Sequence, residues 1–161
     1  MTGEPEGKEC KTGDWTNIQK VSAGMTHTIG LRTNGTVLAA GYNEYGECDV
    51  SAWTNIVDVC AGKRFTVGLK SDGTVVATGY NDDRQCNVSN WRNIIALSRG
   101  AADHIAAIKS DGTVVAAGTN ESGQCNVSNW KNITAVLHRV RLLGKRFYIR
   151  LKKRWYCRCC G

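Results

Sequence analysis

The eight cysteines and three histidines of this 161-residue sequence are the residues that could bind a metal or supply a nucleophile and its base. The densest group is Cys157, Cys159 and Cys160, and clustered thiolates are typical ligands of zinc. A structural zinc site needs a fourth ligand, and the positive charges of Arg154 and Arg158 oppose a cation there. We therefore predict no metal and no cofactor.

Most of the other cysteines recur at one position of a repeated pattern, which favours a structural role. Four of them stand five residues before a tryptophan: Cys10, Cys48, Cys86 and Cys125. A disulfide framework is not expected, because equivalent positions fall in different units and the N-terminal residues do not resemble a signal peptide. We expect most of these thiols to be reduced.

The histidines of the repeat are also poor candidates for catalysis. His27 and His104 occupy the position that Phe65 holds in the unit between them. A catalytic base is not expected to be interchangeable with phenylalanine. We expect these rings to pack near the inner strand of each unit, with a ring nitrogen bonded to a backbone carbonyl.

The acidic residues of the repeat have a similar explanation. Asn34, Asp72 and Asp111 each precede a glycine, so turn chemistry explains them without general acid–base catalysis. No Ser-His-Asp or Cys-His combination stands apart from the repeat. We therefore predict that the protein is not an enzyme and has no small-molecule substrate.

The repeat itself is marked by the phrase Trp-x-Asn-Ile, which recurs at intervals of 38, 38 and 39 residues. It begins at Trp15, Trp53, Trp91 and Trp130. This periodicity predicts five segments: 1–14, the end strand of a preceding unit; complete units over 15–52, 53–90 and 91–129; and 130–161, the start of a fourth unit.

Each unit reads as a set of short strands. Phe65, Val67 and Leu69 alternate with other residues, and Asp72 and Gly73 then supply residues that tolerate positive φ in a tight turn. With a segment after the tryptophan and a short piece near the last cysteine, each unit offers about four strands. Such a unit is typical of a β-propeller blade, whereas the coils of the competing parallel β-helix are shorter and lack a hairpin turn. We predict an all-β fold, a partial, open β-propeller of about three four-stranded antiparallel blades.

The recurring pattern is Gly-x-x-His-Thr-x-Gly-Leu-x-x-Asn/Asp-Gly-Thr-Val-x-Ala-x-Gly-x-Asn-x-x-Gly-Gln/Glu-Cys. It resembles the repeat of the regulator of chromosome condensation family, in the compact form common in bacterial proteins. The resemblance covers residues 7 to about 136 and includes three complete copies. It implies a seven-bladed propeller, so we expect this chain to be a fragment of a seven-bladed parent.

Both ends of the sequence depart from complete blades. Residues 7–14 match the last strand of a preceding blade. Either this strand completes the final blade of a closed ring, or the sequence begins in the middle of a blade. From about residue 138 the pattern stops. Residues 148–161 have possible codons that, read one nucleotide later, encode Thr-Phe-Gly-Leu-Lys-Ser-Asp-Gly-Thr-Val-Val-Ala-Ala-Gly, whose last nine residues equal residues 110–118. We predict that this segment is a frame-shifted reading of a fourth blade.

The net charge of +7 is confined to the C-terminal segment. Nine of the 21 lysines and arginines lie within residues 138–161, which contain no acid, and residues 1–137 carry a net charge of −2. A body with this charge is not expected to bind nucleic acid. The apolar runs are too short to span a membrane, and we predict a cytoplasmic protein.

Residues that differ between the units are the better guide to binding. They form two loop series: 25–26, 63–64 and 101–103, and 44–45, 82–84 and 121–122. Loops on a rigid scaffold commonly carry recognition, and tyrosine and arginine are enriched at binding hot spots. Tyr45, Arg64 and Arg84 are therefore the candidate partner-binding residues.

The predicted function is a non-enzymatic repeat scaffold for protein–protein interaction, with a protein partner that the sequence does not identify. The resemblance implies two alternatives. One is guanine-nucleotide exchange on a small GTPase, the activity of the family's eukaryotic founder. The other is enzyme inhibition, since a propeller with similarly short repeats inhibits β-lactamases. The exposed edges of an open array also predict self-association.

Overall fold

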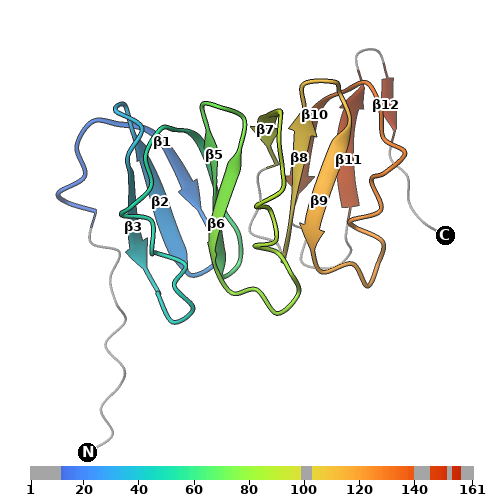
Figure 1. Cartoon of the computed structure of the whole chain (residues 1–161). Coiled ribbons are helices and arrows are strands. Elements are labelled where there is room, and N and C mark those ends of the chain that lie inside the picture. The colour runs from blue at the N-terminus through green and yellow to red at the C-terminus, as the bar shows by residue number, and fades with distance from the viewer. Residues whose placement is uncertain (1–11, 99–102, 140–145, 152–153, 157–161) are drawn as a thin grey trace, which may run out of the picture.

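The computed structural model describes residues 12–98, 103–139, 146–151 and 154–156, and every element in these ranges is a β-strand. The strands form four antiparallel sheets of three strands each, stacked in chain order (Figure 1). We call these sheets blades 1 to 4. Their strands are β1 (Ile18–Ala23), β2 (His27–Arg32) and β3 (Val37–Gly41); β4 (Ile56–Ala61), β5 (Phe65–Lys70) and β6 (Val75–Gly79); β7 (Ile94–Leu97), β8 (His104–Lys109) and β9 (Val114–Gly118); β10 (Ile133–Arg139), β11 (Arg146–Leu151) and β12 (Arg154–Tyr156).

The all-β, open propeller-like architecture agrees with the prediction, but each sheet has three strands and not four. The segment around Cys86 forms consecutive turns in place of a fourth strand. The backbone amides of this segment form hydrogen bonds within it. The amide of Val88 donates to the carbonyl of Cys86 at 2.8 Å, and the amide of Trp91 donates to the carbonyl of Val88 at 2.9 Å. Few groups are therefore left for a ladder with β6.

The hairpins lie where Asn-Gly and Asp-Gly predicted them, although the aspartate has a different role. In blade 2 the amide of Gly73 donates to the carbonyl of Lys70 at 3.0 Å, and Gly73 has a φ of +78°. This geometry is a type I turn followed by a left-handed glycine. Asp72 is not left-handed; its carboxylate accepts hydrogen bonds from the amide and hydroxyl of Thr74 at 2.8 and 2.6 Å.

The Asn-Ile pair of each Trp-x-Asn-Ile phrase links its own hairpin to the preceding blade, a role that the sequence did not reveal. Asn55 has a φ of +59°, which lets its carbonyl accept from the amide of Ser71 in the hairpin of its own blade at 2.9 Å. The amide of the next residue, Ile56, then donates to Gly35 of blade 1 at 3.0 Å. The same inter-blade bond recurs, at 3.0 Å each, between Ile94 and Gly73 and between Ile133 and Gly112.

The core lies in the seams between blades. The middle strand β5 is buried along residues 65–69, since it is covered on both faces. The first seam joins residues of blade 1 to residues of blade 2: Ile29, Leu31 and Val37 with Ile56, Val59 and Ala61. The second joins blades 2 and 3: Phe65, Val67 and Leu69 with Ile94, Leu97 and Ile105. Each blade thus needs a neighbour to keep its apolar face from water.

Several sequence predictions fall outside the described residues. These are the body of the N-terminal end strand, including Cys10, residues 99–102 of the third variable loop, and the cluster Cys157, Cys159 and Cys160. Frame-shifted reading of the last segment remains a prediction. Among the residues that the model describes, no helix is long and apolar enough to cross a membrane.

The glycine that ends each third strand gives a stability prediction. Gly79 has a φ of +110°, and an added Cβ would lie 2.5 Å from the carbonyl oxygen of Arg64 and 2.7 Å from the Cα of Phe65. Because backbone atoms cannot move aside cheaply, we expect Gly79→Ala to lower the free energy of unfolding by ~2–4 kcal/mol in a urea titration. Gly13→Ala is the matched control, since nothing lies within 4 Å of its Cβ position. Equal midpoints for the two variants would contradict this account.

Candidate functional site

Both series of variable loops leave the same edge of the sheets. In each blade the first and third strands run antiparallel to the second, so the loops that follow the first and third strands meet at one edge. In blade 1 these loops are residues 24–26 and 42–49, and His27 pairs with Gly41 beside them. We call this side of the array the loop face, and the side with the Asn-Gly and Asp-Gly hairpins the turn face.

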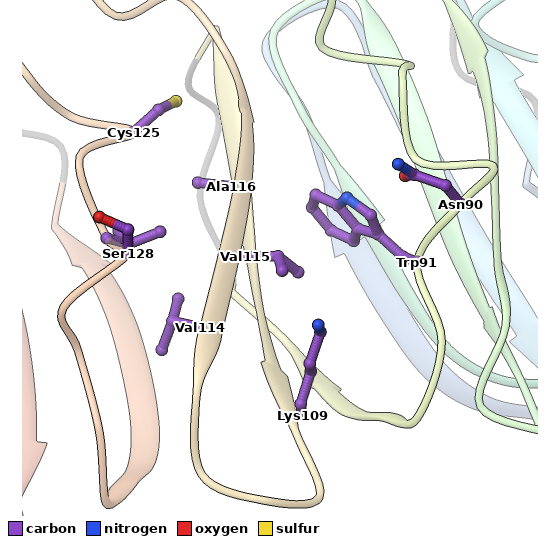
Figure 2. A pocket seen from close by; sticks show the side chains of 9 residues that line it. Asn90, Trp91, Lys109, Val114, Val115, Ala116, Cys125 and Ser128 are labelled. Atoms are coloured by element: carbon purple, nitrogen blue, oxygen red, sulfur yellow. The ribbon is translucent and has the colours of Figure 1, made fainter.

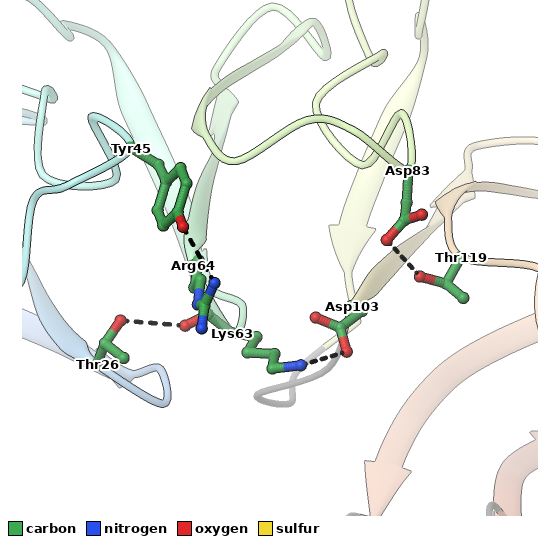
Figure 3. Close-up of polar contacts among 7 residues, drawn as sticks. All are labelled: Thr26, Tyr45, Lys63, Arg64, Asp83, Asp103 and Thr119. Carbon is green, nitrogen blue, oxygen red and sulfur yellow. Dashed lines mark hydrogen bonds and ion pairs between the residues drawn. The ribbon is translucent and has the colours of Figure 1, made fainter.

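Two of the three predicted binding residues meet on the loop face, across the first seam. Arg64 of blade 2 donates from Nη1 to the hydroxyl of Tyr45 of blade 1 at 3.2 Å (Figure 3). The guanidinium carbon also lies 5.3 Å from the centre of the Tyr45 ring, within cation–π range. The Tyr80 ring meets Tyr45 edge-on, with 5.1 Å between centroids. Neighbouring rings therefore hold an exposed arginine in place.

The loop that carries Tyr45 is fixed by a buried acid. Glu47 is 1% exposed, and its Oε2 accepts a hydrogen bond from the Tyr45 amide at 2.9 Å. Gln85 and Gln124 do the same in blades 2 and 3, for the amides of Asp83 and Ser122. Sequence reasoning missed this role, although the Glu or Gln that recurs before each cysteine was the signal for it.

The second seam places different chemistry at the same positions. Asp83, Asp103 and Thr119 are the counterparts there of Tyr45, Arg64 and Tyr80. Thr119 donates to Asp83 Oδ2 at 3.0 Å, and Asp103 forms an ion pair with Lys63 at 3.1 Å (Figure 3). The first seam is therefore aromatic and basic on the loop face, whereas the second is acidic.

Arg84, the third predicted residue, lies in the next loop and is not brought to Tyr45 and Arg64 by any hydrogen bond or ion pair among the described residues. Its φ is +64°, and its equivalents in blades 1 and 3 are Gly46 and Gly123, with φ of +80° and +73°. A left-handed conformation is unfavourable for arginine by roughly 1 kcal/mol. The role of Arg84 in partner binding stays a prediction.

His27 has a structural role in the first seam, with one difference from the prediction. Its Nε2 lies 2.7 Å from the hydroxyl of Thr66, not from a backbone carbonyl. Thr66 uses its only proton to donate to the carbonyl of Glu47 at 2.7 Å, so His27 Nε2 must be the donor in the first contact. In the second seam Phe65 and Ile105 hold these two positions and belong to one apolar cluster.

The described cysteines of the repeat form no disulfide with one another, and their thiols lie near backbone carbonyls. The thiol of Cys86 lies 3.5 Å from the carbonyl of Tyr80, and Cys125 makes the equivalent contact with Thr119 at 3.5 Å. Within the described ranges, no group of three or more His, Cys, Asp or Glu side chains could hold a metal.

A hollow of about 300 Å³ lies in blade 3 (Figure 2). It is lined mainly by apolar residues of the repeat, including Trp91, Val114 and Val115, with Lys109 as its charged group. This volume is at the lower limit of small-molecule sites, and few polar groups converge on it. The variable residues lie elsewhere, so the loop face is the better candidate site.

Comparison with known proteins agrees with this architecture. Residues 18–47 and 56–85 match the family model described as Regulator of chromosome condensation (RCC1) repeat. No curated protein matches the sequence. The chain therefore contains RCC1 repeats, arranged as part of a β-propeller.

Three solved structures illustrate the similarity of fold. Human WBSCR16 has 18% identity and a TM-score of 0.65 over 84% of this chain and 45% of its own. Prp20p of Saccharomyces cerevisiae has 13% identity and a TM-score of 0.65 over 84% and 43%. The CRINKLY WD40 ectodomain of the Arabidopsis thaliana receptor kinase ACR4 has 21% identity and a TM-score of 0.66 over 87% and 55%. This chain thus spans about half the length of the propellers it matches.

The buried histidine predicts a pH dependence of stability. Burial lowers the pKa of His27 from 6.5, and the charge of nearby Glu47 opposes this shift. The unfolded chain then binds the proton more tightly, so stability is present above pH 6.5 and falls as the pH drops through that value. The slope can reach about 1.4 kcal/mol per pH unit. Between pH 7.5 and pH 5.5, urea titrations should show a smaller decrease in the free energy of unfolding for His27→Phe than for the wild type. Equal decreases would refute the assignment of this pH dependence to His27.

The cysteines give a second prediction. Burial raises the pKa of Cys86 to about 11. Because only the thiolate reacts, alkylation by iodoacetamide at pH 8 should be roughly a hundredfold slower in the native chain than in the urea-unfolded chain. Mass spectrometry of the peptide that contains Cys86 measures both rates. A native rate close to the unfolded rate would show that the thiol is not held as described.

Proposed function

We propose that this chain is a non-enzymatic repeat scaffold that binds a protein partner through the loop face, with Tyr45 and Arg64 at the centre of the contact. One observation carries the proposal. Positions that are alike in all repeats have structural roles, such as the Asn55 bond within its blade, the Ile56 bond across the seam and the Gly79 turn. The two series of variable loops gather on one face and change its chemistry from seam to seam.

The exposure of this face supports a role in binding. Met25, Tyr42 and Tyr45 are 65%, 52% and 38% exposed, and they are three of the six large apolar side chains exposed among the described residues. The amide of Tyr42 bonds to Thr26, and the hydroxyl of Thr26 bonds to Lys63, so the loops are tied together. A face of tyrosine, methionine and arginine is the composition typical of protein interfaces.

The contacts of Arg64 reduce the entropic cost of binding. One Nη1 hydrogen bond and the Tyr45 ring already restrict its side chain. Its remaining N–H groups make no hydrogen bond with the described residues, so they can donate to a partner. Interfaces gain affinity when such a side chain is ordered before the partner arrives.

One of the solved structures suggests a more specific function, which this chain's own residues do not favour. Prp20p is described by its binding to Gsp1p and histones. At 13% identity that comparison concerns the fold, and a fold by itself does not define a partner. The scaffold proposal rests on the loop face alone.

Matched arginine variants test the proposal. The full chain and its Tyr45→Ala, Arg64→Ala and Arg92→Ala variants would each be used as bait, and the captured proteins quantified by tandem mass spectrometry. Arg92 is an exposed arginine on the turn face whose guanidinium bonds only to nearby carbonyls, at 2.7 Å to Ser89 and 2.8 Å to Trp91. We expect Arg64→Ala and Tyr45→Ala to reduce capture of the same protein about tenfold or more, because hot-spot truncation costs ~2 kcal/mol or more.

The Arg92→Ala control distinguishes the loss of a specific binding surface from a general effect of removing an exposed arginine. Arg92→Ala should retain the capture, since the partner contacts the opposite side of the array. Loss with Arg92→Ala as well, or retention by all three variants, would rule out the loop face as the binding surface. Matching circular dichroism spectra would show that the variants remain folded.

A further inference from the structure

The outer strand of blade 3 has one backbone edge without a partner strand. β9 pairs with β8, and the hydrogen bond from the amide of Lys109 to the carbonyl of Thr113 at 2.9 Å sets which groups face β8. In this antiparallel register the N–H and C=O groups of Val114 and Ala116 point away from β8. No described residue forms a hydrogen bond with these outward groups. Such an edge is a template for one more strand.

The hollow in blade 3 lies along this edge. Figure 2 shows residues 90–91 on one side of β9 and residues 125–128 on the other, so these two segments flank the strand. Residues 115–118 of β9 are half-buried. Beyond them the edge is closed, because the thiol of Cys125 lies 3.6 Å from the carbonyl of Gly118. The opening is therefore a short groove whose floor is the backbone of residues 114–116.

Trp91 forms one wall of this groove for a reason that is specific to blade 3. In blade 2 the equivalent ring of Trp53 lies against a glycine of the middle strand, and an added Cβ at Gly68 would lie 2.8 Å from that ring. The equivalent residue of blade 3 is Ala107, whose own Cβ keeps the Trp91 ring out of that place. The Trp91 ring instead belongs to the apolar cluster of the second seam and lines the hollow. It can receive an apolar side chain of a ligand.

Lys109 gives the groove a positive charge. It lies on the same side of β9 as Trp91 and Val115 (Figure 2). Its ammonium group forms no ion pair with the described residues. The nearest acid along the chain is Asp111, whose carboxylate accepts hydrogen bonds from the amide and hydroxyl of Thr113 at 2.8 and 2.7 Å. A carboxylate of the ligand would therefore be the partner of Lys109.

We propose that β9 binds an extended peptide segment of a partner protein as an added antiparallel strand, the commoner way for strands to pair. The backbone of the segment pairs with Val114 and Ala116, and strand addition of this kind is a recurring mode of peptide recognition. The side chain opposite Val115 packs against Trp91. The side chain two residues later lies on the same face of the sheet, beside Lys109. The recognised pattern is an apolar residue, any residue and an acidic residue.

The shape and chemistry of the groove favour a peptide over a small molecule. Its volume of about 300 Å³ is at the lower limit of small-molecule sites. An open strand edge, in contrast, offers donors and acceptors at the spacing of another strand. Main-chain hydrogen bonds supply affinity, and Trp91 and Lys109 supply selectivity. This inference is independent of the proposed function, which concerns the loops at the first seam.

Proline substitutions on two outer strands provide a matched test. Ala116→Pro removes an outward N–H of β9 and leaves the ladder with β8 intact, because edge strands tolerate proline where the N–H faces solvent. Ala77→Pro is the control at the equivalent position of β6. The full chain and each variant would select peptides from a phage-displayed library of random heptapeptides, which are then sequenced. We expect the wild type and Ala77→Pro to enrich the apolar-x-acidic pattern, and Ala116→Pro to recover about tenfold fewer such peptides or less.

A charge reversal tests the same groove without altering the backbone. Lys109→Glu should replace the enriched acidic residue by lysine or arginine, whereas Lys70→Glu, the equivalent change in blade 2, should leave the acidic preference unchanged. This pair decides the question if Ala116→Pro fails to fold by circular dichroism. A general loss of structure would reduce recovery but would not reverse the charge of the selected peptides.

Three results would overturn the proposal. They are a wild-type chain that enriches no apolar-x-acidic peptides, equal recovery of these peptides by folded Ala116→Pro, and an unchanged preference with Lys109→Glu. Arg64→Ala separates this proposal from the loop face, since it should leave the selected pattern as it is. Enrichment that is lost with Arg64→Ala and kept with Ala116→Pro would assign peptide binding to the loop face and refute binding at β9.

Discussion

The structure depends on burial between successive sheets, because a three-stranded sheet of this size cannot cover both of its faces by itself. The middle strand of blade 2 is buried along residues 65–69, and the apolar clusters at the first two seams each take residues from two blades. Hydrogen bonds hold the blades in register, above all the bond from Ile56 to Gly35 and its two equivalents. Contacts between repeats thus complete a core that no single repeat can bury.

Much of the fold could be predicted because the same local sequence signals recur in each unit of the repeat. Strand alternation, Asp-Gly corners and the spacing of the tryptophans identified the sheets and their order. The prediction of a fourth strand was wrong, because the backbone amides around Cys86 form hydrogen bonds within turns. Apolar composition alone does not distinguish such a turn segment from a strand. The left-handed Asn55 was missed although asparagine is among the residues that tolerate positive φ, because the recurring asparagine was read only as part of the repeat phrase.

The candidate site could be predicted only as separate residues. Tyr45 and Arg64 were chosen because they differ from their equivalents, and the structure adds that they contact each other across a seam. That contact involves two blades and is not encoded by any local pattern. The same is true of His27 and Thr66, because the sequence indicates a buried ring but not the hydroxyl of the next blade that accepts its proton.

The seam tolerates changes in chemistry when both of its positions change together. The first seam pairs His27 with Thr66, and the second places Phe65 and Ile105 in one apolar cluster, so a polar pair and an apolar pair occupy equivalent space. In the first seam the Nε2 of His27 has the hydroxyl of Thr66 as its partner, whereas a mixed pair would bury this nitrogen against a hydrocarbon. Loop positions are under no such constraint, because water satisfies whatever they expose. Recognition can therefore vary on the loop face while the seams keep the blades in place.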